Sequence, residues 1–467
     1  MCSGKDTMNT RLRRISALAV TALAAGALTL PAGTAHATSP SMSTPATADT
    51  GAPLRSGASW LSGELSAGKW GTTSGGTFYA DMGAVIDAGY AAHAAGNKAA
   101  ATKAAHTLAL PANADSYVGT GTEHYAGPTA KALAFEQLVG GSTTLGSHHL
   151  LADLESMVTA TGRIQDVSAY GDYANTIGQA FAAEALHEAG SAKADSATGF
   201  LLTQQCKAGW FRLYFTDATP AATGPDDFPP HAQSDEACDA DPTATADTDV
   251  TAYAILNLLD QRSTPAVATA IDKAVAWLES TQKADGSFVG GVSTDTPNAD
   301  STGLAGWALG AGGAKAAAKA ASWVYRHQLH RGPDAGAIAY DNTALKAITS
   351  KGIDRTVIGQ WRTATAQALP SLAYLPAVSV FAKPAARAHR GTVVVRISVS
   401  GSPRFRGPVT VKIGHKKLHA RVVHGKARLN AAKVFRGRTH VRAIVSFKGS
   451  RSVAPFRKAL VLKAKHR

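Results

Sequence analysis

Phe288-Val-Gly-Gly-Val-Ser-Thr-Asp-Thr-Pro-Asn-Ala-Asp300-Ser-Thr-Gly303 contains the pattern that decides the fold of this chain. An aromatic residue precedes a loop, and a short polar residue then opens a segment of small residues. The opening pattern returns six times, as Asp81-Met-Gly-Ala, Gly127-Pro-Thr-Ala, Asn175-Thr-Ile-Gly, Asp249-Val-Thr-Ala, Asp300-Ser-Thr-Gly and Asp341-Asn-Thr-Ala. An aromatic or apolar residue lies upstream of the first five, at Trp70, Tyr117, Ile164, Trp210 and Phe288. Repeats of this length predict a helical array, and six helical hairpins are enough to close a ring.

The spacing of the repeats predicts how the array is built. Successive pattern positions lie 46, 48, 74, 51 and 41 residues apart, so the long interval indicates an insertion at about 211–246, rich in acidic residues and Pro. Each unit is predicted to be a helix, a turn and a second helix, over a domain at 58–372. The second helices, as at 130–138, 177–186 and 303–309, are rich in Ala and Gly, which suits the crowded inner layer of a double ring.

The residues at the pattern positions are suited to open helices. Side-chain oxygens of Asp and Asn accept hydrogen bonds from the unpaired amides of a first turn, and the charge of Asp complements the helix dipole. Gly127 followed by Pro128 serves the same purpose, because Pro is preorganised for the first helical position.

The first 37 residues have the features of an export signal. Three arginines precede an apolar run at 15–30, and Ala35-His36-Ala37 offers a small-residue cleavage site. The run is too short for a membrane anchor, and no later segment reads as a transmembrane helix. Residues 38–57 are mostly Ser, Thr, Pro and Ala, and they predict a flexible leader. Both the general and the twin-arginine export routes remain open.

Cleavage would leave two cysteines, Cys206 and Cys238. An even pair in an exported protein predicts a disulfide, which would fix the 211–246 insertion to the preceding helix. Acidic residues of the insertion, at 235, 236, 239 and 241, are of a type that binds calcium, but their spacing is not that of an EF-hand. We predict neither a metal nor another cofactor.

The chain is an acidic body followed by a basic tail. Residues 38–376 contain 20 Lys plus Arg and 32 Asp plus Glu, whereas 377–467 contain 23 Lys plus Arg and no acidic residue. The tail alternates apolar and polar residues in short runs separated by Gly-containing turns, which predicts an antiparallel β-sandwich over 377–467. The expected strands are 393–399, 409–413, 418–423, 427–429, 441–447 and 459–462.

Gln282-Lys-Ala-Asp-Gly-Ser-Phe288 resembles the glutamine–aromatic repeat of terpenoid cyclases and protein prenyltransferases, and Gln204-Gln-Cys-Lys-Ala-Gly-Trp210 is a looser copy. The resemblance to this squalene cyclase and prenyltransferase superfamily covers about 58–369 and implies an (α/α)6 toroid of six helical hairpins. The Asp-Gly would form the turn, the aromatic residue would pack between hairpins, and Gln would bond a helix end. The tail, through runs such as Gly407-Pro-Val-Thr-Val-Lys-Ile413, resembles bacterial Ig-like modules, which act as spacers or adhesive domains.

The cyclase resemblance implies one candidate catalytic residue. Asp247-Thr-Asp249-Val-Thr-Ala252 matches the Asp-x-Asp-Asp-Thr-Ala acid of class II cyclases except at Val250, so Asp249 would donate the proton. Two observations oppose this role. Asp300 and Asp341 share the same repeat position, which favours helix capping, and an aromatic content of 7% is low for a cavity that steadies carbocations. The zinc site of prenyltransferases is not visible, because a disulfide explains both cysteines better.

The inner helices of a toroid all start at one end, so the pattern positions should ring one mouth. Tyrosines two residues before the first three pattern positions would suit stacking and hydrogen bonding to a sugar or another polar ligand. Alternatively, the tyrosines pack between hairpins and the acids only cap helices. The candidate binding residues are Tyr79, Asp81, Tyr125, Tyr173, Asn175, Asp300 and Asp341.

A domain with only positive side chains repels itself, a cost that a polyanionic partner would offset. The basic residues expected to share outer faces are Arg396, Lys412, Arg421, Arg428 and Arg442. Anionic wall polymers or lipid headgroups are the expected partners, and sparse aromatic residues disfavour nucleic acid. We therefore predict a secreted protein retained at the cell wall or cell surface, with the toroid as a scaffold for a ligand or partner. The alternative is a toroid enzyme, either terpenoid cyclase-like with Asp249 as acid or a polysaccharide lyase or hydrolase.

Overall fold

The computed structural model describes residues 51–74, 77–216, 233–291, 294–376, 378–399, 405–448 and 456–465. The chain divides into two compact units, the first ending at Ala373 and the second beginning at Tyr374. The predicted signal peptide lies outside the described residues. The first helix, α2 (Gly51–Ala67), begins before the predicted domain start at residue 58. Within the described ranges, no helix has the length and apolar character needed to span a membrane.

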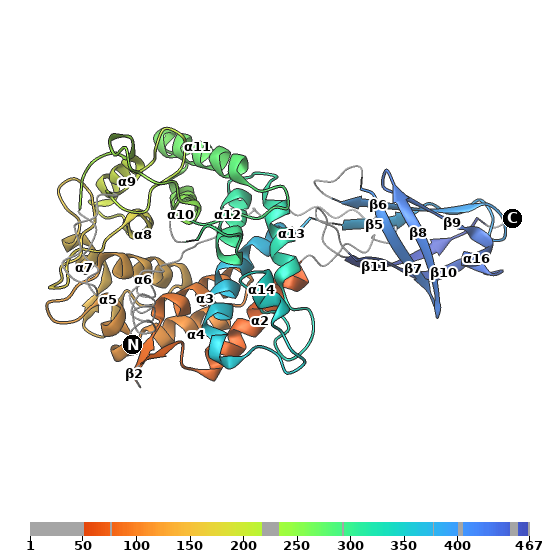
Figure 1. Ribbon diagram of the computed structural model, residues 1–467, viewed down its shortest axis with the longest axis horizontal. Helices are drawn as coiled ribbons and strands as arrows, with labels where there is room; N and C mark the ends of the chain where they lie inside the picture. The colour runs from red at the N-terminus through yellow and green to blue at the C-terminus, as the bar shows by residue number, and fades with distance from the viewer. Residues whose placement is uncertain are drawn as a thin grey trace, which may run out of the picture. The chain divides into compact units, whose positions relative to one another are not determined.

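In the described part of the first unit, six helices form a closed ring. Each contacts the next in the order α3, α6, α8, α10, α12 and α15, and α15 returns to α3. Figure 1 shows these helices around a common centre with the other helices outside them. The ring helices are α3 (Met82–Ala94), α6 (Ala126–Val139), α8 (Thr176–Glu188), α10 (Thr248–Leu258), α12 (Ala299–Ala311) and α15 (Ile358–Ala368). The first unit is therefore a helical toroid.

The outer layer supplies one helix or helix pair to each ring helix. These outer helices are α2, α4 (Lys98–Leu108), α5 (Pro111–Val118), α7 (Leu150–Ser156), α9 (Ala194–Thr203), α11 (Pro265–Thr281) and α13 (Ala317–His327). Shorter elements lie in the connections: β1 (Gly71–Ser74), β2 (Thr77–Ala80), β3 (Thr144–Leu145), β4 (His148–His149), α14 (Asn342–Lys346) and the 3-10 turns at Cys238–Ala240, Leu259–Gln261, Arg355–Val357 and Leu369–Tyr374.

A glutamine ties each turn to the next outer helix in three successive hairpins. In each case the side-chain amide donates two hydrogen bonds. One goes to the carbonyl of a glycine in the turn, and the other goes to a backbone carbonyl in the next outer helix or in the residue directly before it. The bonds run from Gln205 to Gly209 and Ala270, from Gln282 to Gly286 and Ala316, and from Gln328 to Gly336 and Pro53, all at 2.8–3.2 Å. Because Pro53 belongs to α2, the last pair of bonds joins the two ends of the toroid.

A second repeated contact identifies the sixth ring helix. The backbone N–H of the residue packed between hairpins donates to a threonine hydroxyl of the ring helix: Phe211 to Thr251, Phe288 to Thr302 and Ile338 to Thr365, at 2.8–2.9 Å. Thr365 lies on α15, so α15 is the sixth ring helix. The prediction that Asp341 opens this helix is wrong, because Asp341 caps the five-residue α14. The packed residue of the fourth unit is the fully buried Phe211, directly after the expected Trp210.

Seven antiparallel strands form a single sheet in the described part of the second unit, in the order β11-β10-β7-β8-β9-β6-β5. They are β5 (Val378–Ala382), β6 (Thr392–Val399), β7 (Gly407–Ile413), β8 (Lys416–Val423), β9 (Lys426–Asn430), β10 (His440–Phe447) and β11 (Phe456–Lys463), with a short helix α16 (Ala431–Phe435). Strands β5 and β11 also contact each other, so the sheet is nearly closed. An Ig-like sandwich has two separate sheets packed face to face. Here all seven strands belong to one sheet, so the predicted sandwich is corrected to a single, nearly closed antiparallel sheet.

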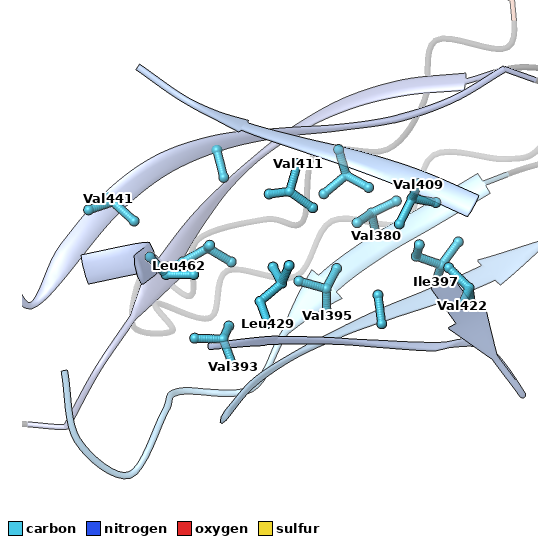
Figure 2. Packing of buried hydrophobic residues seen from close by; sticks show 14 of the residues in the cluster. Val380, Val393, Val395, Ile397, Val409, Val411, Val422, Leu429, Val441 and Leu462 are labelled. Atoms are coloured by element: carbon cyan, nitrogen blue, oxygen red, sulfur yellow. The ribbon is translucent and has the colours of Figure 1, made fainter. Parts of the chain in front are cut away.

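The core of this β-domain follows from the alternation of its strands. Val393, Val395 and Ile397 on β6 are buried, whereas the side chains between them face outward. Figure 2 shows these three on the inside of the sheet, beside Leu429 of the neighbouring strand β9 and on the side that faces Val411 of β7. Since successive side chains of a strand point to opposite faces, apolar residues fill the inside and most basic residues lie outside, with the buried Lys458 on β11 as an exception.

Candidate functional site

Three of the predicted mouth residues are helix caps. Asp81 caps α3 by accepting from the N–H of Ala84 at 2.9 Å, Asn175 caps α8 through two such bonds, and Asp341 caps α14. Ring helix α6 has no side-chain cap of its own. Its first N–H, at Ala126, donates instead to Asp166 Oδ1 at 2.7 Å from the following hairpin. The prediction that these acids and amides open helices therefore holds for three positions.

Asp249 and Asp300 are not caps, contrary to the capping interpretation. Asp247 caps α10, accepting from the N–H of Asp249 at 2.8 Å, and Asn298 caps α12, accepting from the N–H of Ser301 at 2.8 Å. Asp249 and Asp300 each lie two residues further on, in the first turn. Both segments offer two acceptors two residues apart, and the first of them takes the capping position. This leaves the two second carboxyls available for other contacts.

The two carboxyls come together at the start of neighbouring ring helices. Ser301 Oγ donates to Asp249 Oδ2 at 3.1 Å. The other oxygen of Asp249, and Oδ1 of Asp300, are buried and have no hydrogen-bond partner among the described residues. The loop after Phe288 lies close to Asp249 and Ser301, because a Cβ added to Gly290 would lie 3.0 Å from Asp249 Oδ2 and 2.9 Å from Ser301 Oγ. We call Asp249, Asp300 and Ser301 the acid pair site.

Burial changes the protonation of these carboxyls. It raises the pKa of Asp300 to about 7, with a further contribution from Asp87. Burial, followed by the charge of Asp247, raises the pKa of Asp249 well above its ordinary value. A carboxyl in an apolar, crowded environment favours its neutral form. Near neutral pH the acid pair site therefore holds a proton that it can donate.

Aromatic rings from four ring helices contact one another inside the toroid. The rings of Tyr90, Phe135, Phe181 and Tyr253, one each from α3, α6, α8 and α10, are separated by 5.1–6.5 Å between neighbouring centroids. Tyr90 meets Phe181 although α3 and α8 are not neighbours in the ring, so the rings meet across its centre. Lys131 and Asp87, which lie one turn nearer the helix starts, form a buried ion pair at 2.5 Å. Polar and aromatic side chains thus both lie inside the ring.

Two of the three predicted tyrosines, Tyr125 and Tyr173, lie beside Asp166. Tyr79 lies on β2 and is 47% exposed. Tyr125 precedes α6, and the N–H of Tyr173 donates to Asp166 Oδ2 at 3.1 Å, so both lie at Asp166. Two other tyrosines, Tyr253 and Tyr340, are close enough to the acid pair site for the charges of Asp249 and Asp300 to raise their pKa values. Burial and then these charges raise the pKa of Tyr340 to about 12. Sequence reasoning missed Tyr340, although it stands directly before a pattern position.

The predicted disulfide is confirmed. Cys206 and Cys238 are bonded, with their Cα atoms 5.0 Å apart. Beside them the buried Arg212 donates to Gln204 Oε1 at 2.9 Å and pairs with Asp241 at 3.1 Å. Much of the 211–246 insertion, from 217 to 232, lies outside the described residues. Within the described ranges, no group of three or more His, Cys, Asp or Glu side chains is arranged to hold a metal ion.

The outer face of the β-domain brings like charges into direct opposition. Arg396 on β6 is paired in register with Lys426 on β9, and Lys412 on β7 with Lys417 on β8. The predicted Arg428 lies beside the pair of Arg396 and Lys426. These three residues and Lys383 line a hollow of about 320 Å³. The predicted Lys412, Arg421 and Arg442 are exposed on β7, β8 and β10, outside this hollow.

The chain matches no known family model and no curated protein sequence. It is similar in structure to a protein from Actinoplanes, at 18% identity and a TM-score of 0.44 over 70% of this chain and 99% of that one. It is also similar to the type II terpene cyclase MstE from Scytonema, at 18% identity and 0.45 over 69% and 96%. An unsaturated glucuronyl hydrolase specific for heparin gives 10% identity and 0.45 over 70% and 96%. The chain's own contacts, rather than these similarities, define its ring.

Proposed function

We propose that this protein is exported and is held at an anionic cell-wall or cell-surface polymer by its β-domain, while the toroid binds a ligand or partner. The observation that carries the proposal is the direct opposition of Arg396 to Lys426 and of Lys412 to Lys417. Like charges directly opposite each other destabilise a sheet. The region 377–467 has no acidic side chain to relieve them, so an external polyanion is the natural counter-charge.

Co-sedimentation with purified cell walls tests this proposal. The chain from Thr38 onward is mixed with walls that retain or lack their anionic polymers, across a salt series. Binding that requires the polymer and weakens with salt is expected, because exposed charges are screened within about 10 Å at 0.1 M salt. A variant with Lys412, Lys417, Arg421 and Arg442 changed to Gln should bind less. Equal binding to walls without the polymer, or by this variant, would refute the proposal.

The acid pair site favours a second candidate function, in which the toroid is an enzyme using Asp249 as a general acid. Its support is that Asp249 is released from capping and carries a buried oxygen without a partner among the described residues. Burial raises the pKa of this carboxyl and so favours its protonated form, as an acid that protonates a substrate requires. The substrate classes suggested for this candidate are isoprenoids, as in terpenoid cyclases, and polysaccharides.

Asp249→Asn separates this candidate from a purely structural role. The exchange keeps the size of the side chain and its bond from Ser301, but it removes the acidic proton. Activity on an isoprenoid or polysaccharide substrate should fall by at least about a hundredfold, the usual contribution of a general acid. Asp295→Asn, at an exposed residue of the preceding loop, is the matched control. Activity that survives Asp249→Asn would show that another group is the acid.

A further inference from the structure

We infer that the hollow beside β6 and β9 is a subsite for one phosphodiester group carrying a short polyol arm. The inference rests on the proposed function and names the chemical unit that the β-domain recognises. The hollow has a volume of about 320 Å³, and four basic side chains line it, from Lys383, Arg396, Lys426 and Arg428. We call it the basic hollow.

The register of the sheet explains why these side chains share one place. Arg396 lies opposite Lys426, and Arg428 lies two residues further along β9, opposite Val394. Residues two apart on a strand point to the same face, so the three cations project from one side. Lys383 follows directly after β5, which pairs with β6. The sheet thus gathers four positive charges from three neighbouring strands around one hollow.

The guanidinium of Arg396 has a donor without an acceptor, which indicates that a ligand of the hollow should supply one. Its Nε is buried and has no hydrogen-bond partner among the described residues. An arginine donor left unpaired in this way is unfavourable unless a ligand accepts its hydrogen bond. Phosphate oxygens suit this group, because the planar fork of arginine binds them through two parallel bonds. An anion bound here would also separate the opposed charges of Arg396 and Lys426.

The remaining lining indicates a ligand larger than a free ion. Val394, Ala385 and Pro384 supply apolar surface, and Thr392 supplies a hydroxyl. A volume of about 320 Å³ lies at the lower end of the range for small-molecule sites, about 300–1,000 Å³. Phe381, 45% exposed and paired in register with Arg396, adds an aromatic face at the edge. A phosphodiester with a polyol arm matches both the charges and this mixed surface.

The recessed position of the Arg396 Nε favours a polymer chain over a membrane surface. A planar layer of lipid headgroups can reach exposed cations such as Lys412 and Arg421, whereas a buried donor is reached only by a group that enters the hollow. A single flexible chain can place one phosphodiester there and leave the next unit in solvent. We therefore assign the ligand to a polyol-phosphate polymer.

Binding of glycerophosphoglycerol, a soluble phosphodiester with two polyol arms, tests the subsite in the chain from Thr38 onward. Two variants remove the same charge: Arg396→Gln with Lys426→Gln at the basic hollow, and Lys433→Gln with Arg438→Gln, which are exposed on α16 and in the turn after it. We expect the first to raise the Kd, measured by titration calorimetry, at least about tenfold, because it removes charge-assisted bonds. The second should change the Kd less than about twofold at fixed salt. Lys383→Gln with Arg428→Gln, at exposed positions, provides a second variant in case the first is unstable.

The outcomes separate this inference from the proposed function. Equal losses for the hollow variant and the Lys433/Arg438 control, or no saturable binding of glycerophosphoglycerol, would overturn the subsite, whereas salt-sensitive wall binding would still support polymer association. Tighter binding to phosphatidylglycerol vesicles, with the same dependence on Arg396 and Lys426, would overturn the assignment to a polymer. Loss of wall binding as well as probe binding in the wild-type chain would reject both proposals.

Discussion

Changing Asp300 to Asn should stabilise the toroid at alkaline pH and leave it almost unchanged at acidic pH. Burial raises the pKa of Asp300 from 3.8 to about 7. Between these values the unfolded chain loses the proton of Asp300, whereas the folded chain keeps it. The folded state then binds more protons than the unfolded state, so stability falls as the pH rises through this window. Asn does not ionise, so the stability of the variant should not fall with pH through this group.

The size of the effect follows from the width of the window. One pKa unit corresponds to about 1.4 kcal/mol, so between pH 4.5 and pH 8 the wild-type chain loses about 3 kcal/mol through Asp300. Any cost of the new amide, including an unsatisfied N–H beside Asp249, is the same at both pH values. The difference between the two pH values therefore isolates the ionisation of this one carboxyl.

Urea unfolding followed by tryptophan fluorescence measures this difference. All seven tryptophans lie between residues 60 and 361, so the signal reports the toroid and not the β-domain. Urea is preferred to guanidinium because it is uncharged and does not screen the carboxyls. Asp295→Asn, at an exposed loop residue, should show no change between the two pH values. If Asp300→Asn shifts the free energy of unfolding equally at pH 4.5 and pH 8, the buried acid pair does not exist as described.

Three further changes test the contacts that hold the toroid. Arg362→Gln should lower the free energy of unfolding by about 2 kcal/mol, because it removes a buried cation 2.7 Å from Glu64, which then keeps its ion pair with the more exposed Arg355 at 2.8 Å. Gly286→Ala should cost about 2 kcal/mol or more, because φ is +96° and the new Cβ would lie 2.4 Å from the carbonyl oxygen of Lys319. Cys238→Ser should cost about 2–4 kcal/mol by releasing the insertion. Urea titrations read by tryptophan fluorescence measure all three.

Matched changes distinguish these contacts from general damage. Arg262→Gln, in an exposed pair with Asp272, should cost less than about 1 kcal/mol. Gly313→Ala has a similar φ of +85° but no atom within 4 Å of the new Cβ, so it should cost less than Gly286→Ala. Dithiothreitol should destabilise the wild-type chain but not Cys238→Ser. Equal effects within any of these comparisons would contradict the contact concerned.

The toroid was predictable because its sequence repeats the residues that connect neighbouring hairpins. Gln282 and its turn glycine are visible as a motif, and the structure shows that the amide joins consecutive hairpins. The sixth repeat was misplaced for a physical reason. Asp341 has the pattern of a cap and does cap a helix, but α14 is only five residues long and α15 completes the ring.

The candidate site was only partly predictable, because the pattern does not distinguish two acceptors two residues apart. Asp247 and Asp249 can each cap a helix by chemistry alone, and the choice depends on where the backbone enters α10. One tertiary contact at this entry is the hydrogen bond from the Phe211 N–H to the Thr251 hydroxyl, which the sequence pattern does not reveal. A pattern search therefore finds the right segment but assigns the cap to the wrong carboxyl. Which of the two carboxyls does not cap the helix becomes clear only from the three-dimensional structure.

Strands in the tail were predictable from alternation alone, and all six expected strands are present in the structure. Their connection into one sheet was not, because sheet order depends on which edges meet. The first strand, β5, pairs with β6 and also contacts β11, and this short edge strand carries little signal in the sequence. The charge opposition of Arg396 and Lys426 likewise appears only when the register is known.

Both candidate sites lie where the chain departs from the rules that stabilise a fold. Asp300 is a carboxyl kept away from water, and Arg396 faces another cation without an acid nearby. Natural sequences are locally consistent elsewhere, and the exceptions tend to concentrate at functional positions. The two departures are independent, since one lies at the start of ring helices and the other on a strand face. Stabilising the acid pair through Asp300→Asn should therefore leave wall binding unchanged, whereas Arg396→Gln should weaken binding without altering tryptophan-detected unfolding.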